Sequence, residues 1–453
     1  MPLPPGIPRA ILGCTTRLLT EGRALFTPQH LFGEAQPPDD FLSQAPFLER
    51  ARTEHLRQRE LSARLALGAY LVSRLVERTL THSGDARAEE GLLWQHEAVR
   101  RHLRDLPTDS PESAHLHGIA EAINVTGQPR AGLRLSLTAY AYFLEHEGRL
   151  EEALEILALA VRTHGPEVPD GDFATSALFA GRLNRLLARW MVATNCYLAA
   201  EAAAERTGDR VLSLRARLGR GAVHRGQGNL PLARKTAEEV ATAARRDGLR
   251  EVEAMACSDL GSVLANEGRS VEAVQAIYRA FLLTDDVLQQ TRVLGDLGIA
   301  LLATGAREAA RTAFEIVLRS KTSFLVRTNA LLELMDMESA AGNRMAFERR
   351  RTEADAARTR MPPSMLADLY FKAGVGLARF GQTGRGRTLL ETGLKHAEEH
   401  ELNAWYFRFE RTLDNLAALE LREPELATPT PEQVPPALDE VAVGLREFAL
   451  QAI

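Results

Sequence analysis

Two histidines one helical turn apart carry the strongest sign of chemistry in this chain. The segment His396-Ala397-Glu398-Glu399-His400 has the H-x-x-E-H order, in which both histidines bind zinc and the glutamate activates water. A zinc site of this kind needs a third ligand, and only a remote carboxylate such as Glu440 or Glu447 could supply it. The competing interpretation is a charged, solvated helix end beside Lys395. We prefer it, because the motif alone is weak evidence.

The other histidines and the glycines give no better sign of catalysis. His96, His102, His115 and His117 lie in one stretch, but no cysteine spacing typical of a metal site accompanies them. The glycines separate helical patterns and do not follow strands, so none forms a phosphate-binding loop. We therefore predict that the protein is not an enzyme, with no catalytic residue, no metal and no cofactor.

The composition limits the kinds of partner. The formal net charge is −5, whereas a protein that binds nucleic acid directly is normally basic over at least one domain. Nearly all basic residues are Arg, either for bidentate recognition of carboxylates and phosphates or, as we prefer, through a codon bias that also enriches Ala. The three cysteines lie far apart, which fits a reducing compartment, and no segment has a membrane-spanning length. We expect a cytoplasmic protein that contacts neither nucleic acid nor a membrane.

Glycines recur along the chain at a nearly constant interval. Each follows one apolar helical pattern and precedes another, so each is typical of the turn between two antiparallel helices. The steps are 40, 37, 37 and 39 residues, from Gly228 to Gly268, Gly305, Gly342 and Gly381. Gly148 lies 80 residues before Gly228, and the missing turn falls near Arg189. Such a period indicates a stack of helical repeats.

The clearest repeat runs from Glu251 to about Leu283. Leu260, Gly261 and Leu264 lie on its first helix, Gly268 forms the turn, and one face of the second helix carries Ala273, Ile277 and Ala280. The next repeat has the same pattern at Leu297, Gly298, Leu301, Gly305, Ala310, Phe314 and Val317, and the one before it at Gly221, Gly228, Ala233, Ala237 and Val240. Small residues at 261 and 273 indicate that the two helices cross closely. Around Gly342 the small residue is replaced by Phe347, which should widen that pair or shift its register.

These residues resemble the tetratricopeptide repeat (TPR). The resemblance implies an all-α fold, a right-handed superhelical α-solenoid of antiparallel helix pairs with little or no sheet. The repeats here are longer than the usual length of about 34 residues, and the Trp of that family is mostly missing. Another α-solenoid, or a helical bundle with the same glycine spacing, remains the alternative.

The chain divides around this repeat array. We expect a loosely ordered arm over residues 1–44, an atypical helical region or cap over 45–125, and the TPR-like array over 126–400. A capping helix over 401–422, a Pro-rich linker over 423–436 and an amphipathic helix over 437–453 should follow. Two points stay open: whether the first 125 residues continue the array, and whether the C-terminal helix docks on its own chain, for instance in the groove, or on another chain.

The resemblance also implies a binding face. In that family the first helix of each pair lines the concave face, where ligands bind. An alignment on the small crossing residues places nine side chains there: Arg215, Arg225, Asn266, Arg292, Asn329, Asp336, Asp368, Phe371 and Arg379. Arg and Asn could hold the carboxylates and backbone of a peptide. The corresponding positions carry no Lys, which argues against the Lys and Asn clamp of chaperone-binding members. For each residue, ordinary solvation of a concave wall is the alternative.

Three classes of function follow. The first, which we prefer, is a scaffold or adaptor that binds a protein or peptide segment in the groove. The second is a regulatory or sensory TPR protein that controls a signalling or transcription partner. The third and most remote is a zinc hydrolase. The identity of the partner, the pathway and the oligomeric state are not encoded in any pattern that we recognise.

Overall fold

The computed structural model describes residues 45–81, 86–123, 131–164, 168–416, 441 and 443–445, and among these it contains helices and turns but no strand. The N-terminal helices are α2 (Ala45–Leu56), α3 (Glu60–Thr81), α4 (Ala86–Arg104) and α5 (Pro111–Ala122). The first helices of the pairs that follow are α6 (Ala131–His146), α8 (Asp170–Leu186), α10 (Arg210–Gly226), α12 (Arg250–Asn266), α14 (Val287–Ala303), α16 (Phe324–Ala340) and α18 (Pro363–Arg379). Their second helices are α7 (Leu150–Arg162), α9 (Trp190–Thr207), α11 (Leu230–Arg246), α13 (Ser270–Leu283), α15 (Arg307–Arg319), α17 (Arg344–Ala357) and α19 (Thr383–Glu399). A short 3-10 helix, η2 (Arg358–Arg360), follows α17, and α20 (Asn403–Asp414) follows the last pair.

The predicted glycines form the turns between the two helices of a pair. Gly148, Gly228, Gly268, Gly305, Gly342 and Gly381 each have a positive φ, between 72° and 84°. In this left-handed region a side chain is penalised, which explains why glycine recurs there. In the pair α8–α9, where the turn glycine is missing, Ala188 takes the same role with φ 57°. The prediction of inter-helix turns is confirmed.

Small residues at the helix crossings are confirmed as well. A Cβ on Gly261 would lie 2.3 Å from Cγ1 of Ile277, so only glycine allows α12 and α13 to approach this closely. Gly298 meets the ring of Phe314 in the same way in the next pair. The expected widening around Phe347 has a specific solution: its fully buried ring lies against Gly376 of α18, where a Cβ would be 2.3 Å from the ring. The large side chain is therefore accommodated by a glycine in the next pair.

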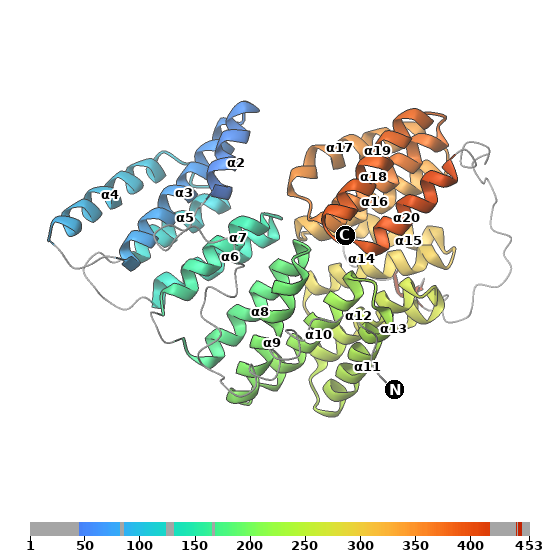
Figure 1. Ribbon diagram of the computed structural model, residues 1–453, viewed down its shortest axis with the longest axis horizontal. Coiled ribbons are helices and arrows are strands. Elements are labelled where there is room, and N and C mark those ends of the chain that lie inside the picture. The colour runs from blue at the N-terminus through green and yellow to red at the C-terminus, as the bar shows by residue number, and fades with distance from the viewer. Residues whose placement is uncertain are drawn as a thin grey trace, which may run out of the picture.

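Consecutive first helices contact one another from α8 onward. The contacts run from α8 to α10, α12, α14, α16, α18 and finally α20. The array therefore bends toward its first helices, as the curved arrangement in Figure 1 shows. We call the side of the first helices that faces into this curve the inner face.

The curvature brings distant parts of the chain together. Arg360 of η2 donates from Nε to the backbone oxygen of Glu147 at 2.7 Å, and its Nη2 lies 3.1 Å from Oε2 of the same residue. Its guanidinium also lies 4.1 Å from the ring centroid of Phe324. A Cβ on the neighbouring Gly148 would be 2.4 Å from that ring. The α6–α7 turn thus rests on α16 and on η2, whose Arg360 lies 213 residues from Glu147 in the sequence.

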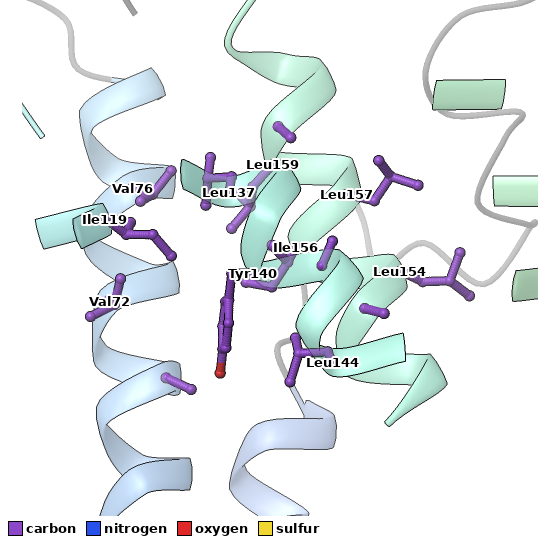
Figure 2. Packing of buried hydrophobic residues seen from close by; sticks show 14 of the residues in the cluster. Val72, Val76, Ile119, Leu137, Tyr140, Leu144, Leu154, Ile156, Leu157 and Leu159 are labelled. Atoms are coloured by element: carbon purple, nitrogen blue, oxygen red, sulfur yellow. The ribbon is translucent and has the colours of Figure 1, made fainter. Parts of the chain in front are cut away.

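The N-terminal helices share a core with the first pair of the array. Figure 2 shows Val72 and Val76 of α3 and Ile119 of α5 facing Leu137, Tyr140 and Leu159 of α6 and α7. The hydroxyl of the fully buried Tyr140 donates to Oε1 of Glu112 at 3.0 Å. The helices α2–α5 are therefore packed on the array by a continuous apolar interior.

Buried charges cross the same junction. Glu112 of α5 lies 2.7 Å from both Arg50 of α2 and Arg149 in the α6–α7 turn. Burial alone would raise the pKa of Glu112, but the two arginines lower it below its usual value. For Glu152 the balance is opposite: burial raises its pKa to about 7, although Arg50 lies 2.8 Å away. The two arginines thus favour the ionised form of Glu112, whereas burial favours the protonated form of Glu152.

The described part of the C-terminal segment packs on its own chain. Val441 and Leu445 are only 2% and 1% exposed and belong to a cluster with residues of α12–α16. Gly444 lies against the ring of Tyr278, so this part of the segment lies beside α13, a second helix. The expected Pro-rich linker and the arm over residues 1–44 lie outside the described residues.

Candidate functional site

The inner face carries a recurring stripe of polar side chains. Positions three, four and seven residues apart share one side of a helix, and on α8 and α10 these positions hold Arg182, Arg185, Arg215 and Arg225. On α12, α14, α16 and α18 the stripe continues at Asp259, Asn266, Arg292, Asp296, Asn329, Glu333, Asp336, Asp368, Lys372 and Arg379. Since the first helices contact one another in succession, these side chains form one continuous surface. The structure therefore brings together eight of the nine predicted residues, all except Phe371, and adds several that were not predicted.

The part of the inner face formed by α8, α10 and α14 is rich in arginine. We call Arg182, Arg185, Arg215, Arg225 and Arg292 the arginine half. Arg182 is the one with a carboxylate partner: its Nε lies 2.6 Å from Oε1 of Glu145 on α6. Burial lowers the pKa of Arg182, and Arg292 and Arg185 lower it further, against the attraction of Glu145. The guanidinium groups of neighbouring pairs therefore repel one another.

Arg225 is the least satisfied member of this half. Its Nε is buried and has no hydrogen-bond partner among the described residues. Burial lowers the pKa of Arg225, Arg185 and Arg292 also lower it, and Asp259 and Asp296 oppose them. Together with Asp259, Arg225 lines a small hollow whose other walls come from Leu218, Gly221, Ala222, Ala233, Ala237 and Val263 of α10, α11 and α12. Among the described residues, Arg225 therefore has nearby carboxylates but no ion pair or hydrogen bond from its guanidinium group.

The two nearby aspartates compensate the arginines only in part. Asp296 accepts a hydrogen bond from Oγ of Ser258 at 3.1 Å. Burial raises the pKa of Asp296 in spite of the attraction of Arg292 and Arg225. Within the described residues, neither Asp259 nor Asp296 comes within the 4.0 Å of an arginine nitrogen that defines an ion pair. Five arginines thus face three carboxylates, and only one pair is in contact.

The part of the inner face formed by α16 and α18 has the opposite character. We call Glu333, Asp336, Asp368, Lys372 and Arg379 the paired half. Nζ of Lys372, which is 5% exposed, lies 2.7 Å from both Glu333 and Asp368. Nη1 of Arg379 lies 2.7 Å from Oδ1 of Asp336 and donates to Oγ of Ser339. Each charge in this half therefore has a partner inside the protein.

Three of the predicted residues differ in how accessible their side chains are to a ligand. Asn266 and Asn329 are exposed at the inner face. Phe371 is 9% exposed, with Arg408 of α20 stacked 4.1 Å from its ring centroid and Phe409 at 5.5 Å. We therefore do not carry Phe371 forward as a ligand contact. Its position under α20 could not be read from the repeat pattern, because α20 belongs to no pair.

Several charges of the inner face were not predicted from the sequence. Arg182 and Arg185 lie in the degenerate pair around Arg189, from which the alignment on the small crossing residues took no residue. Lys372 does lie on a first helix, contrary to the statement that these positions carry no Lys. Its spacing of four residues from Asp368 was the signal that could have found it. Asp259 and Asp296 were also not predicted, and they lie on the same polar side of α12 and α14.

The zinc hypothesis gains no support. Nε2 of His396 lies 2.9 Å from the backbone oxygen of Pro363, and the ring centroids of His396 and His400 are 4.5 Å apart. In the described part of the chain, no three His, Cys, Asp or Glu side chains are grouped as metal ligands. The suggested third ligands Glu440 and Glu447 lie outside it. None of the described helices combines the length and the apolarity that a membrane span requires.

Comparison with known proteins supports the fold. No model of a known protein family and no curated protein matches the sequence. Among solved structures, the Rap conjugation gene regulator of the plasmid pLS20 in complex with the Phr* peptide is similar with a TM-score of 0.52, at 12% identity, over 74% of this chain and 96% of that one. A Rap protein complexed with competence and sporulation factor has a TM-score of 0.46 at 10% identity, covering 79% and 98%. The apo form of RapI has 0.44 at 8% identity, covering 58% and 97%.

The helix pairs, the glycine turns and the similarity to the pLS20 regulator agree. The chain folds as a TPR-like α-solenoid.

Proposed function

We propose that this protein is an adaptor whose inner face binds a peptide segment of a protein partner. The observation that carries the proposal is the continuous polar surface formed by successive first helices. On this surface Arg215 and Arg225 each have a buried Nε without a hydrogen-bond partner among the described residues. Buried polar groups normally have partners, and exceptions need an explanation. A bound segment supplies the missing acceptors.

A solved neighbour supports the same kind of ligand. The pLS20 regulator, which shares the fold, is described in complex with a peptide. A solenoid with a concave surface is suited to hold an extended segment, because each repeat adds the same set of positions along the groove.

The experiment is a capture test with a charge-reversed inner face. The variant Arg215→Glu/Arg225→Glu and the unchanged protein are used as bait in extracts of the native cell, and captured proteins are identified by mass spectrometry. The matched control, Lys235→Glu/Arg387→Glu, reverses two charges on the second helices α11 and α19, where both side chains are more than half exposed. We expect a partner that the unchanged and control proteins capture and the inner-face variant loses, with no decrease in its melting temperature. Equal capture by all three contradicts the proposal.

A regulatory role is the second candidate. The pLS20 protein is described as a conjugation gene regulator, which favours a protein whose peptide-bound state controls another macromolecule. The discriminating experiment measures how tightly the protein binds a second captured partner, with and without the synthetic segment that binds the inner face. In a regulator this affinity should change when the segment is bound. In a simple adaptor it should not.

A further inference from the structure

The arginine half of the inner face lacks counter-charge. Within the described residues, no carboxylate lies within ion-pair distance of Arg185, Arg215, Arg225 or Arg292. These four side chains come from the first helices α8, α10 and α14, and α12 lies between α10 and α14. In the rest of the protein, arginines near the inner face or the junction do find carboxylates, as Arg379 and Arg50 show.

The lack of partners is not a result of free exposure to water. The Nε atoms of Arg185, Arg215 and Arg225 are buried, and none of them donates a hydrogen bond to a described residue. A charge with buried N–H donors is costly unless it is paired and hydrogen-bonded. Arg182 and Arg225 are also repelled by Arg185 and Arg292, whereas Arg185 is attracted to Tyr197. An anion that entered between them would remove both costs.

The chemistry of the guanidinium group suits a carboxylate. Guanidinium groups bind carboxylates through paired N–H donors in one plane, and such charge-assisted hydrogen bonds are among the strongest in proteins. The paired half, in contrast, already holds its own carboxylates against Lys372 and Arg379. It offers no free cation to a second anion and no free carboxylate to a basic ligand.

We infer that the ligand of the inner face is an acidic peptide, with a carboxylate bound between Arg225 and Arg292 and close to Arg185. This inference rests on the proposed function, and it names the chemistry of the ligand. The carboxylate can come from a Glu or Asp side chain or from the C-terminus of the peptide. Both sources present the same group to the arginines.

The test uses three pools of fluorescein-labelled octapeptides and fluorescence anisotropy with the full chain. Four central positions are fixed as Glu, Gln or Lys, and the others are randomised among Ala, Leu, Ser and Gly. Each pool is made with a free and with an amidated C-terminus. We expect the Glu pool to bind at least about tenfold more tightly than the Gln pool, which corresponds to about 1.4 kcal/mol. The Lys pool should bind more weakly than both.

Two variants link the preference to the arginines. Arg225→Gln and Arg292→Gln should each weaken binding of the Glu pool about tenfold and leave the Gln pool unchanged. The matched control is Arg217→Gln, on the same helix as Arg225 but turned toward α9, where its Nε lies 2.6 Å from Glu201. It should bind every pool like the unchanged protein.

The outcomes separate the two proposals. Tighter binding of only the free-acid peptides, whatever their side chains, supports the inference and assigns the carboxylate to the C-terminus. Equal binding of the Glu and Gln pools, with no difference between free-acid and amidated peptides, overturns the acidic ligand while the peptide groove stands. Binding of no pool by the unchanged protein contradicts the groove itself, and the inference fails with it.

Discussion

The two halves of the inner face treat charge in opposite ways. In the paired half, Lys372 and Arg379 each hold a carboxylate at 2.7 Å. In the arginine half, Arg225 and Arg292 have no such partner among the described residues, although aspartates lie on the neighbouring helices. Both halves are built from the inward-facing positions of first helices in the same array. Charges that are neutralised inside the protein serve the structure, whereas charges left without a partner are available to a ligand.

The largest effect should come from breaking the paired half at its centre. Lys372→Ala removes the cation between Glu333 and Asp368 and leaves two buried carboxylates side by side. Loss of one member of a buried ion pair typically costs 3–5 kcal/mol, so we expect a decrease of about 3–5 kcal/mol in the free energy of unfolding. Denaturant unfolding followed by circular dichroism measures it. The control Lys235→Ala, at a side chain that is 71% exposed, should change stability by less than about 0.5 kcal/mol. A similarly small change for Lys372→Ala would contradict the structural role of the charges in the paired half.

The junction of α2, α5 and α7 tests the same rule with pH. The pKa of Glu152 is raised to about 7 from 4.5, so the folded protein binds this proton more tightly than the unfolded chain. Stability should therefore fall as the pH rises from about 4.5 to 7 and then level off, by a few kcal/mol in order of magnitude. Thermal melts between pH 5 and pH 8 should show this decline in the unchanged protein and a flatter profile in Glu152→Gln. Identical profiles would show that burial does not raise the pKa of Glu152.

A milder break of the paired half is Arg379→Gln. Arg379 and Asp336 are 30% and 29% exposed, so water screens their attraction, and we expect a loss of about 1 kcal/mol or less. A double-mutant cycle with Asp336→Asn isolates the interaction. Strictly additive losses would mean that this pair contributes nothing, and that the paired half depends on Lys372 alone.

The smallest effect should have the opposite sign. Arg225→Gln removes a half-buried charge that has no ion-pair partner among the described residues, so the free energy of unfolding should stay the same or rise by up to about 1 kcal/mol in the absence of a ligand. The control Arg217→Gln loses an ion pair with Glu201 and should be slightly destabilised. Differential scanning calorimetry of the two variants side by side shows whether each substitution raises or lowers the stability. A clear loss of stability for Arg225→Gln would make the two halves of the inner face equivalent.

The fold was largely predictable from local patterns. The turn glycines were found because a left-handed turn residue is a local requirement, visible at Gly268 or Gly305 without knowledge of the rest of the chain. The close crossings at Gly261 and Gly298 were found for the same reason, since both helices of a pair are near in sequence. Where the local signal was missing, as at Ala188, the pair was judged degenerate and its inner-face arginines were overlooked.

The site was predictable only as a stripe of positions. The repeat alignment identified Arg215, Arg225 and Arg292 as facing inward, but it treated Asp336, Asp368 and Arg379 in the same way. It could not tell that the latter are neutralised, because their partners lie on another pair of the array or are Lys372, which the alignment passed over. It also placed Phe371 among the ligand contacts, since the covering residues of α20 follow no repeat.

The sequence by itself determined the helices, their turns and which side of each first helix is polar, because these depend on interactions within about forty residues. Only the tertiary structure decided which charges are satisfied. The contacts of Arg379 with Asp336 and of Arg360 with Glu147 join residues 43 and 213 positions apart. Electrostatic attraction depends on the distance between the charged groups in space, and the curvature of the array sets that distance.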